Sequence, residues 1–134
     1  MGFRIVGAVL VATSLVSSGV ARLSANAAQP ELTVVFSLKQ ISIDLPSTLS
    51  AAEADRRIDE FSYLVESITS CDDAEQIAER IGGHVISNDH VVNEELPPTL
   101  QSTVLNTVIG RATPVFGERW DGVRVLIVCD RRTE

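Results

Sequence analysis

The chain has 134 residues, and its 11 lysines and arginines against 18 aspartates and glutamates give a formal net charge of −7. This length predicts one domain and argues against two. An acidic balance of this kind provides no attraction to a phosphate backbone, so it argues against nucleic-acid binding.

The N-terminal segment, residues 1–27, is predicted to be a secretory signal peptide. Arg4 gives it a short positive start, residues 5–16 form an apolar run, and residues 25–27 fit the small-x-small cleavage rule. A retained membrane anchor is the alternative, although a span needs roughly 20 apolar residues. We expect cleavage after residue 27 and a mature protein that lies in the periplasm without stable membrane insertion.

The first element of the mature chain is predicted to be a strand over residues 32–44, which is rich in branched side chains. Its apolar residues switch from even-numbered to odd-numbered positions near Lys39 and Gln40. This switch suits either a central strand covered on both faces or a strand with a β-bulge. Pro46 ends the strand.

Two helices are predicted to follow this strand. Ser50 and Glu53 form a capping box, and apolar residues then recur at steps of three and four. Ser70 or Asp72 caps a second, shorter helix, and the glycine pair at 82–83 ends it. The inward positions are Ala54, Ile58, Phe61, Val65 and Ile68 in the first helix, and Ala74, Ile77, Ala78 and Ile81 in the second.

The last part of the chain predicts a short strand over 84–87, a polar loop over 88–95 and a helix that prolines 97 and 98 open. Two strands, over 113–116 and 123–130, are joined by a turn-rich hairpin loop. The third helix has an apolar face of Leu100, Val104, Leu105 and Val108, and Gly110 closes it. The sequence therefore predicts a small α+β domain, with a central sheet of about four strands and three main helices packed against it.

The chain has two cysteines, Cys71 and Cys129, and both lie in the mature part. An even count in an oxidising compartment predicts one disulfide. Two buried free thiols are the alternative. A catalytic cysteine paired with His84 or His90 is disfavoured, because nothing around Cys71 is typical of a nucleophile.

Other kinds of site are disfavoured as well. His84 and His90 stand six residues apart without a cysteine or third histidine close in sequence, so we expect no metal site. The chain has no glycine-rich phosphate loop and no nucleophile elbow. The acidic pairs at 72–73 and 94–95 fit a helix start and a solvated loop better than acid–base catalysis. Trp120, at the hairpin tip, is more typical of a packing lid than of a contact residue.

Five stretches occur in a fixed order across residues 34–132: SLKQISI at 37–43, GG at 82–83, LPPTL at 96–100, GRATPV at 110–115 and GVRVLIVCDR at 122–131. Together with the order of the predicted elements, they resemble the parvulin-type peptidyl-prolyl isomerase domain. The forms found in SurA-type periplasmic chaperones are the most similar. The resemblance implies a parvulin-like domain over residues 28–134 and no cofactor.

The resemblance also implies where a site would lie. In this family an apolar pocket grips a proline ring, and polar groups favour the twisted amide over the planar one. The pocket positions correspond to Leu96 and Leu100, which are implied to bind substrate. The polar catalytic positions correspond to Gln40, His84 and Arg124, and all three differ in type from the residues that the family usually carries there.

Three functions remain open at this point. Altered polar positions beside an apolar pocket favour a periplasmic folding factor that binds extended apolar client segments, with weak or lost isomerase activity. An active, divergent isomerase is the second possibility, and an exported, disulfide-stapled domain of unrelated role is the third. The partners expected under the first hypothesis are unfolded or extended polypeptides.

Overall fold

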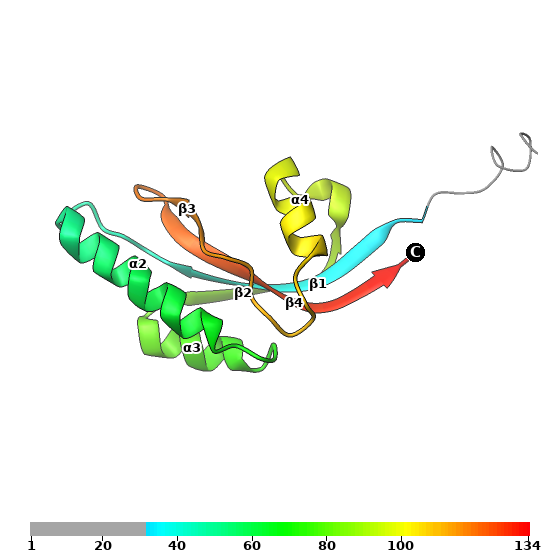
Figure 1. Ribbon diagram of the computed structural model, residues 1–134, viewed down its shortest axis with the longest axis horizontal. Helices are drawn as coiled ribbons and strands as arrows, with labels where there is room; N and C mark the ends of the chain where they lie inside the picture. The colour runs from blue at the N-terminus through cyan, green and yellow to red at the C-terminus, as the bar shows by residue number, and fades with distance from the viewer. Residues whose placement is uncertain (1–31) are drawn as a thin grey trace, which may run out of the picture. The chain divides into compact units, whose positions relative to one another are not determined.

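The computed structural model describes residues 32–134, so the predicted signal peptide lies outside the described residues. The four strands form one antiparallel sheet in the order β2-β1-β4-β3 (Figure 1). The α+β class predicted from the sequence is thereby confirmed. The elements are β1 (Val34–Ile43), α2 (Ala51–Glu66), α3 (Asp73–Ile81), β2 (His84–Val92), the 3₁₀ turn η1 (Asn93–Glu95), α4 (Pro98–Leu105), β3 (Phe116–Glu118) and β4 (Gly122–Thr133).

Helices cover both faces of the sheet, with α2 and α3 on one side and α4 on the other (Figure 1). Odd-numbered apolar residues of β1 and β4 contribute to the core under α2 and α3, and even-numbered ones to a smaller core under α4. Because each central strand serves two cores, it must be apolar on both parities. The main core includes Ile41, Phe61, Val125 and Ile127, and the smaller core includes Phe36, Leu38, Val104 and Val128.

The parity switch predicted in the first strand has one of the two causes that the sequence allowed, because β1 is covered on both faces. β1 is a central strand between β2 and β4. In the β1–β4 pairing, Leu38 pairs with Val128 and Ser37 with Asp130, which leaves Cys129 as an extra residue. The extra residue belongs to β4, and the register shift in the pairing with β2 likewise places the extra residue in β2, so β1 itself carries no bulge.

The two helix starts show different capping. The Ser50 hydroxyl accepts a hydrogen bond from the Glu53 N–H at 3.1 Å, as the capping box predicted. Neither predicted cap, Ser70 or Asp72, makes a side-chain bond at the start of α3; the Asp73 carboxylate accepts from the backbone N–H groups of Thr69 and Ser70 instead. These bonds, with that of Thr69 the stronger cause, hold the pKa of Asp73 below its ordinary value.

The predicted boundary of the second strand is wrong, because β2 continues to Val92 through residues assigned to a polar loop. β2 pairs with β1 along one side and forms an edge of the sheet. Most of its side chains are exposed, so polar side chains such as those of Asn88 and Asp89 stay hydrated there and carry no desolvation penalty. Only η1 remains of the predicted loop.

The predicted bounds of the strand over 113–116 are also wrong, because β3 spans Phe116–Glu118. Pro114 has no N–H with which to extend the ladder. Thr113, which is buried, bonds β4 in another way: its N–H donates to the Leu126 carbonyl at 2.8 Å, and its hydroxyl accepts from the Leu126 N–H at 3.1 Å.

The predicted length and apolar face of the third helix need correction. α4 ends at Leu105 rather than near Gly110. Of the four residues predicted to face inward, only Val104 is fully buried, and Val108 is 69% exposed in the following loop. At this end of the helix, the Arg131 guanidinium donates to the carbonyl groups of Val104 and Leu105.

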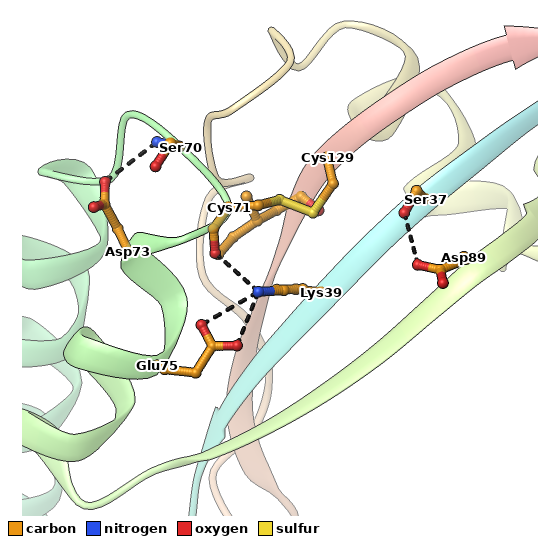
Figure 2. Close-up of a disulfide and its surroundings, with 9 residues drawn as sticks. Ser37, Lys39, Ser70, Cys71, Asp73, Glu75, Asp89 and Cys129 are labelled. Atoms are coloured by element: carbon orange, nitrogen blue, oxygen red, sulfur yellow. Dashed lines mark hydrogen bonds and ion pairs between the residues drawn. A yellow bond between two sulfur atoms is a disulfide. The ribbon is translucent and has the colours of Figure 1, made fainter.

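Cys71 and Cys129 form the predicted disulfide, with their Cα atoms 5.5 Å apart (Figure 2). The alternative of two free thiols is therefore wrong. The bond joins the segment before α3 to the bulge of β4. Lys39 reinforces this junction, since its Nζ donates to the Cys71 carbonyl at 3.2 Å and to the Glu75 carboxylate at 2.8 Å (Figure 2). The bond from Lys39 lowers the pKa of the Glu75 carboxyl.

Candidate functional site

A groove of about 520 Å³ lies on the face of the sheet that carries α4. Side chains of β1 and β4 line it, together with the first turn of α4, the two residues before that helix and the start of β3. Its volume falls within the range of about 300–1,000 Å³ that is usual for binding sites. We call it the α4 groove; its lining residues are Gln40, Leu96, Pro97, Thr99, Leu100, Phe116, Gly117, Arg124 and Leu126.

The register of the sheet brings Gln40 and Arg124 to this face. Gln40 pairs with Leu126 across β1 and β4, and Ser42 pairs with Arg124 one step further along. Directly opposed residues of an antiparallel pair point to the same face, and so do residues two apart on one strand. Phe116 of β3 pairs with Arg124 from the other side and places its ring against the groove.

The charge of Arg124 is largely partnered. One guanidinium nitrogen lies 3.1 Å from the Asp121 carboxylate, and the group lies 5.9 Å from the centroid of the Phe116 ring. The side chain is 32% exposed. Arg124 therefore presents a fixed hydrogen-bond donor beside an aromatic wall, and it is not a free cation.

His84 does not line the groove, although the resemblance implied a place for it at the site. It pairs with Ser42, so it lies on the same face of the sheet as Gln40 and Arg124. Its Nε2 lies 3.5 Å from the Asp44 carboxylate, and both side chains are mostly exposed. The other four implied residues, Gln40, Leu96, Leu100 and Arg124, all line the α4 groove.

The groove contains contact residues that the sequence did not identify. The sequence places Phe116 and Leu126 in strands without indicating a role in a site, and only the strand pairing reveals their position. A second cavity of about 210 Å³ continues toward β2 and shares Gln40, Leu96 and Leu126 with the first. The exposed Ile86 of the edge strand lines this extension.

The lining of the α4 groove suits non-covalent binding. It combines apolar side chains with a few polar groups, and its lining residues include no histidine, cysteine or carboxylate. Gln40 can donate and accept hydrogen bonds, whereas Arg124 can only donate. Such a lining can hold an extended apolar chain and hydrogen-bond its backbone, and it offers no group that titrates near neutral pH.

Arg131 fixes α4, the helix that bounds the groove. Its guanidinium donates to the carbonyl oxygens of Leu105 and Thr107 at 2.9 Å each and to that of Val104 at 3.4 Å. The same group lies 5.7 Å from the centroid of the Phe36 ring. A cation is favourable at these carbonyls because they carry the negative end of the helix dipole.

Arg131→Met should therefore lower the free energy of unfolding by about 1.5–3 kcal/mol, the usual contribution of hydrogen bonds to a charged group. Met retains an apolar stem against Phe36 but leaves the helix carbonyls without a donor. Urea unfolding followed by circular dichroism measures the change. Arg132→Met is the matched control, because Arg132 forms an exposed ion pair with Glu134 that should contribute less than about 1 kcal/mol. Equal effects of the two changes would contradict the anchoring role of Arg131.

Within residues 32–134, no helix is both long and apolar enough to cross a membrane. In the same part of the chain, no group of three or more His, Cys, Asp or Glu side chains is placed so that it could bind a metal ion. Comparisons of the chain with protein-family models, with curated proteins and with solved structures found no match.

Proposed function

We propose that the protein is a parvulin-like folding factor whose α4 groove binds extended apolar segments of unfolded polypeptides, with weak or lost prolyl isomerase activity. One observation carries the proposal: Gln40, Leu96, Leu100 and Arg124, which the family resemblance singled out from distant parts of the chain, line one groove. The order of the helices and strands, from which the resemblance was drawn in part, gives further support.

The chemistry of the groove favours binding over catalysis. Rotation about a prolyl bond must overcome a barrier near 20 kcal/mol, and lowering that barrier requires a closely fitted pocket that favours the twisted amide. Gln40 cannot exchange a proton as an imidazole does. Arg124 is paired with Asp121 and remains partly hydrated, so little of its charge is free to polarise an amide.

Leu100→Asp should weaken the binding of an extended apolar peptide by tenfold or more, since it places a carboxylate against the apolar wall of the groove. Fluorescence anisotropy with a labelled proline-containing peptide measures the affinity. Circular dichroism and a thermal melt show whether the variant is folded. Val108→Asp is the control, because Val108 is 69% exposed and does not line the groove.

Wild-type affinity in a folded Leu100→Asp variant would contradict the proposal. A protease-coupled assay with a prolyl peptide tests the second candidate on the same protein. Turnover within about tenfold of an ordinary parvulin would favour an active, divergent isomerase that uses the polar groups of Gln40 and Arg124.

We also propose that the protein is exported to the periplasm through a cleaved signal peptide. The disulfide between Cys71 and Cys129 supports an oxidising compartment. N-terminal sequencing of protein extracted from cells should find a start at or near Ala28. An intact Met1 on the cellular protein would contradict this proposal.

A further inference from the structure

Exposed carboxylates stand next in sequence to residues that line the α4 groove. Glu94 and Glu95 directly precede Leu96, whose side chain lines both cavities. Glu118 follows Gly117, another lining residue, and it lies on the same face of β3 as Phe116 because the two residues are two apart on one strand. We call Glu94, Glu95 and Glu118 the carboxylate rim. In the part of the chain that the structure describes, none of the three takes part in an ion pair.

The nearby cations do not neutralise this rim. Arg124 lines the groove but is paired with Asp121. Arg119 points away, since its guanidinium donates to the Ala51 carbonyl at 2.7 Å and lies 3.9 Å from the Asp55 carboxylate. Lys39, the only lysine of the sequence, is bound to Glu75 on the opposite face of the sheet (Figure 2).

We propose that the α4 groove selects client segments in which apolar residues are flanked by Lys or Arg, and disfavours segments flanked by Asp or Glu. This inference rests on the proposed function. The apolar lining provides the contact area, while the rim sets the preferred charge on either side of the bound segment. The net charge of −7 adds a weaker attraction of the same sign at longer range.

The preference for basic flanks should behave as interactions between solvent-exposed charges do. Attraction at a solvated rim is modest and is screened by salt, and it acts more on the association rate than on dissociation. Repulsion of acidic segments contributes to selectivity together with attraction of basic ones.

The experiment uses three fluorescent peptides with one apolar, proline-containing centre and flanks of two lysines, two serines or two glutamates on each side. Anisotropy should give the tightest binding for the lysine peptide and the weakest for the glutamate peptide. We expect a ratio of about tenfold at low salt that falls toward unity near 0.5 M salt.

Glu94→Gln combined with Glu95→Gln should remove most of this preference. Asp59→Asn combined with Glu60→Gln is the matched control, because it removes two adjacent exposed carboxylates from α2, which covers the opposite face. The control changes the net charge equally and should leave the preference unchanged. Thermal melts should show both double variants to be folded.

Equal affinity for the lysine and glutamate peptides would overturn charge selection and leave the proposed function in place. An equal loss of preference in the control variant would also overturn it, because net charge and not the rim would then set the preference. Absence of binding by all three peptides would overturn the proposed function together with this inference.

Discussion

Val125→Asp should prevent the protein from folding at 25 °C. Val125 is fully buried in β4, where it pairs with Ile41 of β1 and packs in the main core under α2 and α3. A carboxylate there would have neither water nor a cation, and an unpaired buried charge costs several kcal/mol. For a domain near the lower end of the usual range of about 5–15 kcal/mol, a loss above about 5 kcal/mol leaves less than half of the molecules folded.

Far-UV circular dichroism and urea unfolding of purified Val125→Asp measure this effect. Val108→Asp makes the same chemical change at a residue that is 69% exposed, and it should alter the free energy of unfolding by no more than about 0.5 kcal/mol. A cooperative transition at the wild-type midpoint in Val125→Asp would contradict the central position of β4 and its burial.

Replacing both cysteines by serine should lower the free energy of unfolding by about 2–4 kcal/mol. The disulfide joins residues 58 apart in sequence, and in the chain-entropy model closing such a loop restricts the unfolded chain by about 4 kcal/mol. The folded state should keep its other contacts at this junction, because the Lys39 ammonium group still binds the Cys71 carbonyl and the Glu75 carboxylate when the disulfide is absent. The folded domain should therefore persist with reduced stability.

Urea unfolding with and without a thiol reductant measures this contribution. Reduction should shift the midpoint of the wild-type protein toward that of the double variant, and the double variant should not respond to the reductant. Titration of the denatured, unreduced protein should detect no free thiol. Two thiols per chain, or a double variant as stable as the oxidised wild type, would contradict this prediction.

The local elements follow from the sequence because their causes are local. The Ser50 hydroxyl reaches the Glu53 N–H within the same turn. Gly82, with a φ of 73°, ends α3 because a residue without a Cβ adopts the left-handed conformation at no steric cost. The unbroken apolar character of β4 likewise indicates burial on both faces, which the sheet order confirms.

Part of the groove also follows from the sequence. The resemblance implied Gln40, Leu96, Leu100 and Arg124 from the order of motifs, and these four residues share one cavity. His84 was implied in the same way but lies beside Asp44 instead. The difference arises from the register, because His84 pairs with Ser42, which lies beyond Gln40 along β1 and does not line the groove.

Tertiary contacts decided the remaining features, each through a partner distant in sequence. The last carbonyl groups of α4 are satisfied by Arg131, which lies 26 residues beyond Leu105 in the sequence. β2 extends through polar residues because their backbone groups form hydrogen bonds with the backbone of β1. Phe116 reaches the groove because it pairs with Arg124.

The sequence by itself thus determined where helices begin, which strands are buried and that the two cysteines could join. Only the tertiary structure determined how far each element extends and which side chains share the groove. The physical reason is that a cap or a turn is satisfied within one turn of chain. An edge strand, a capped carbonyl and a shared cavity depend instead on hydrogen bonds and contacts that exist only after the sheet has assembled.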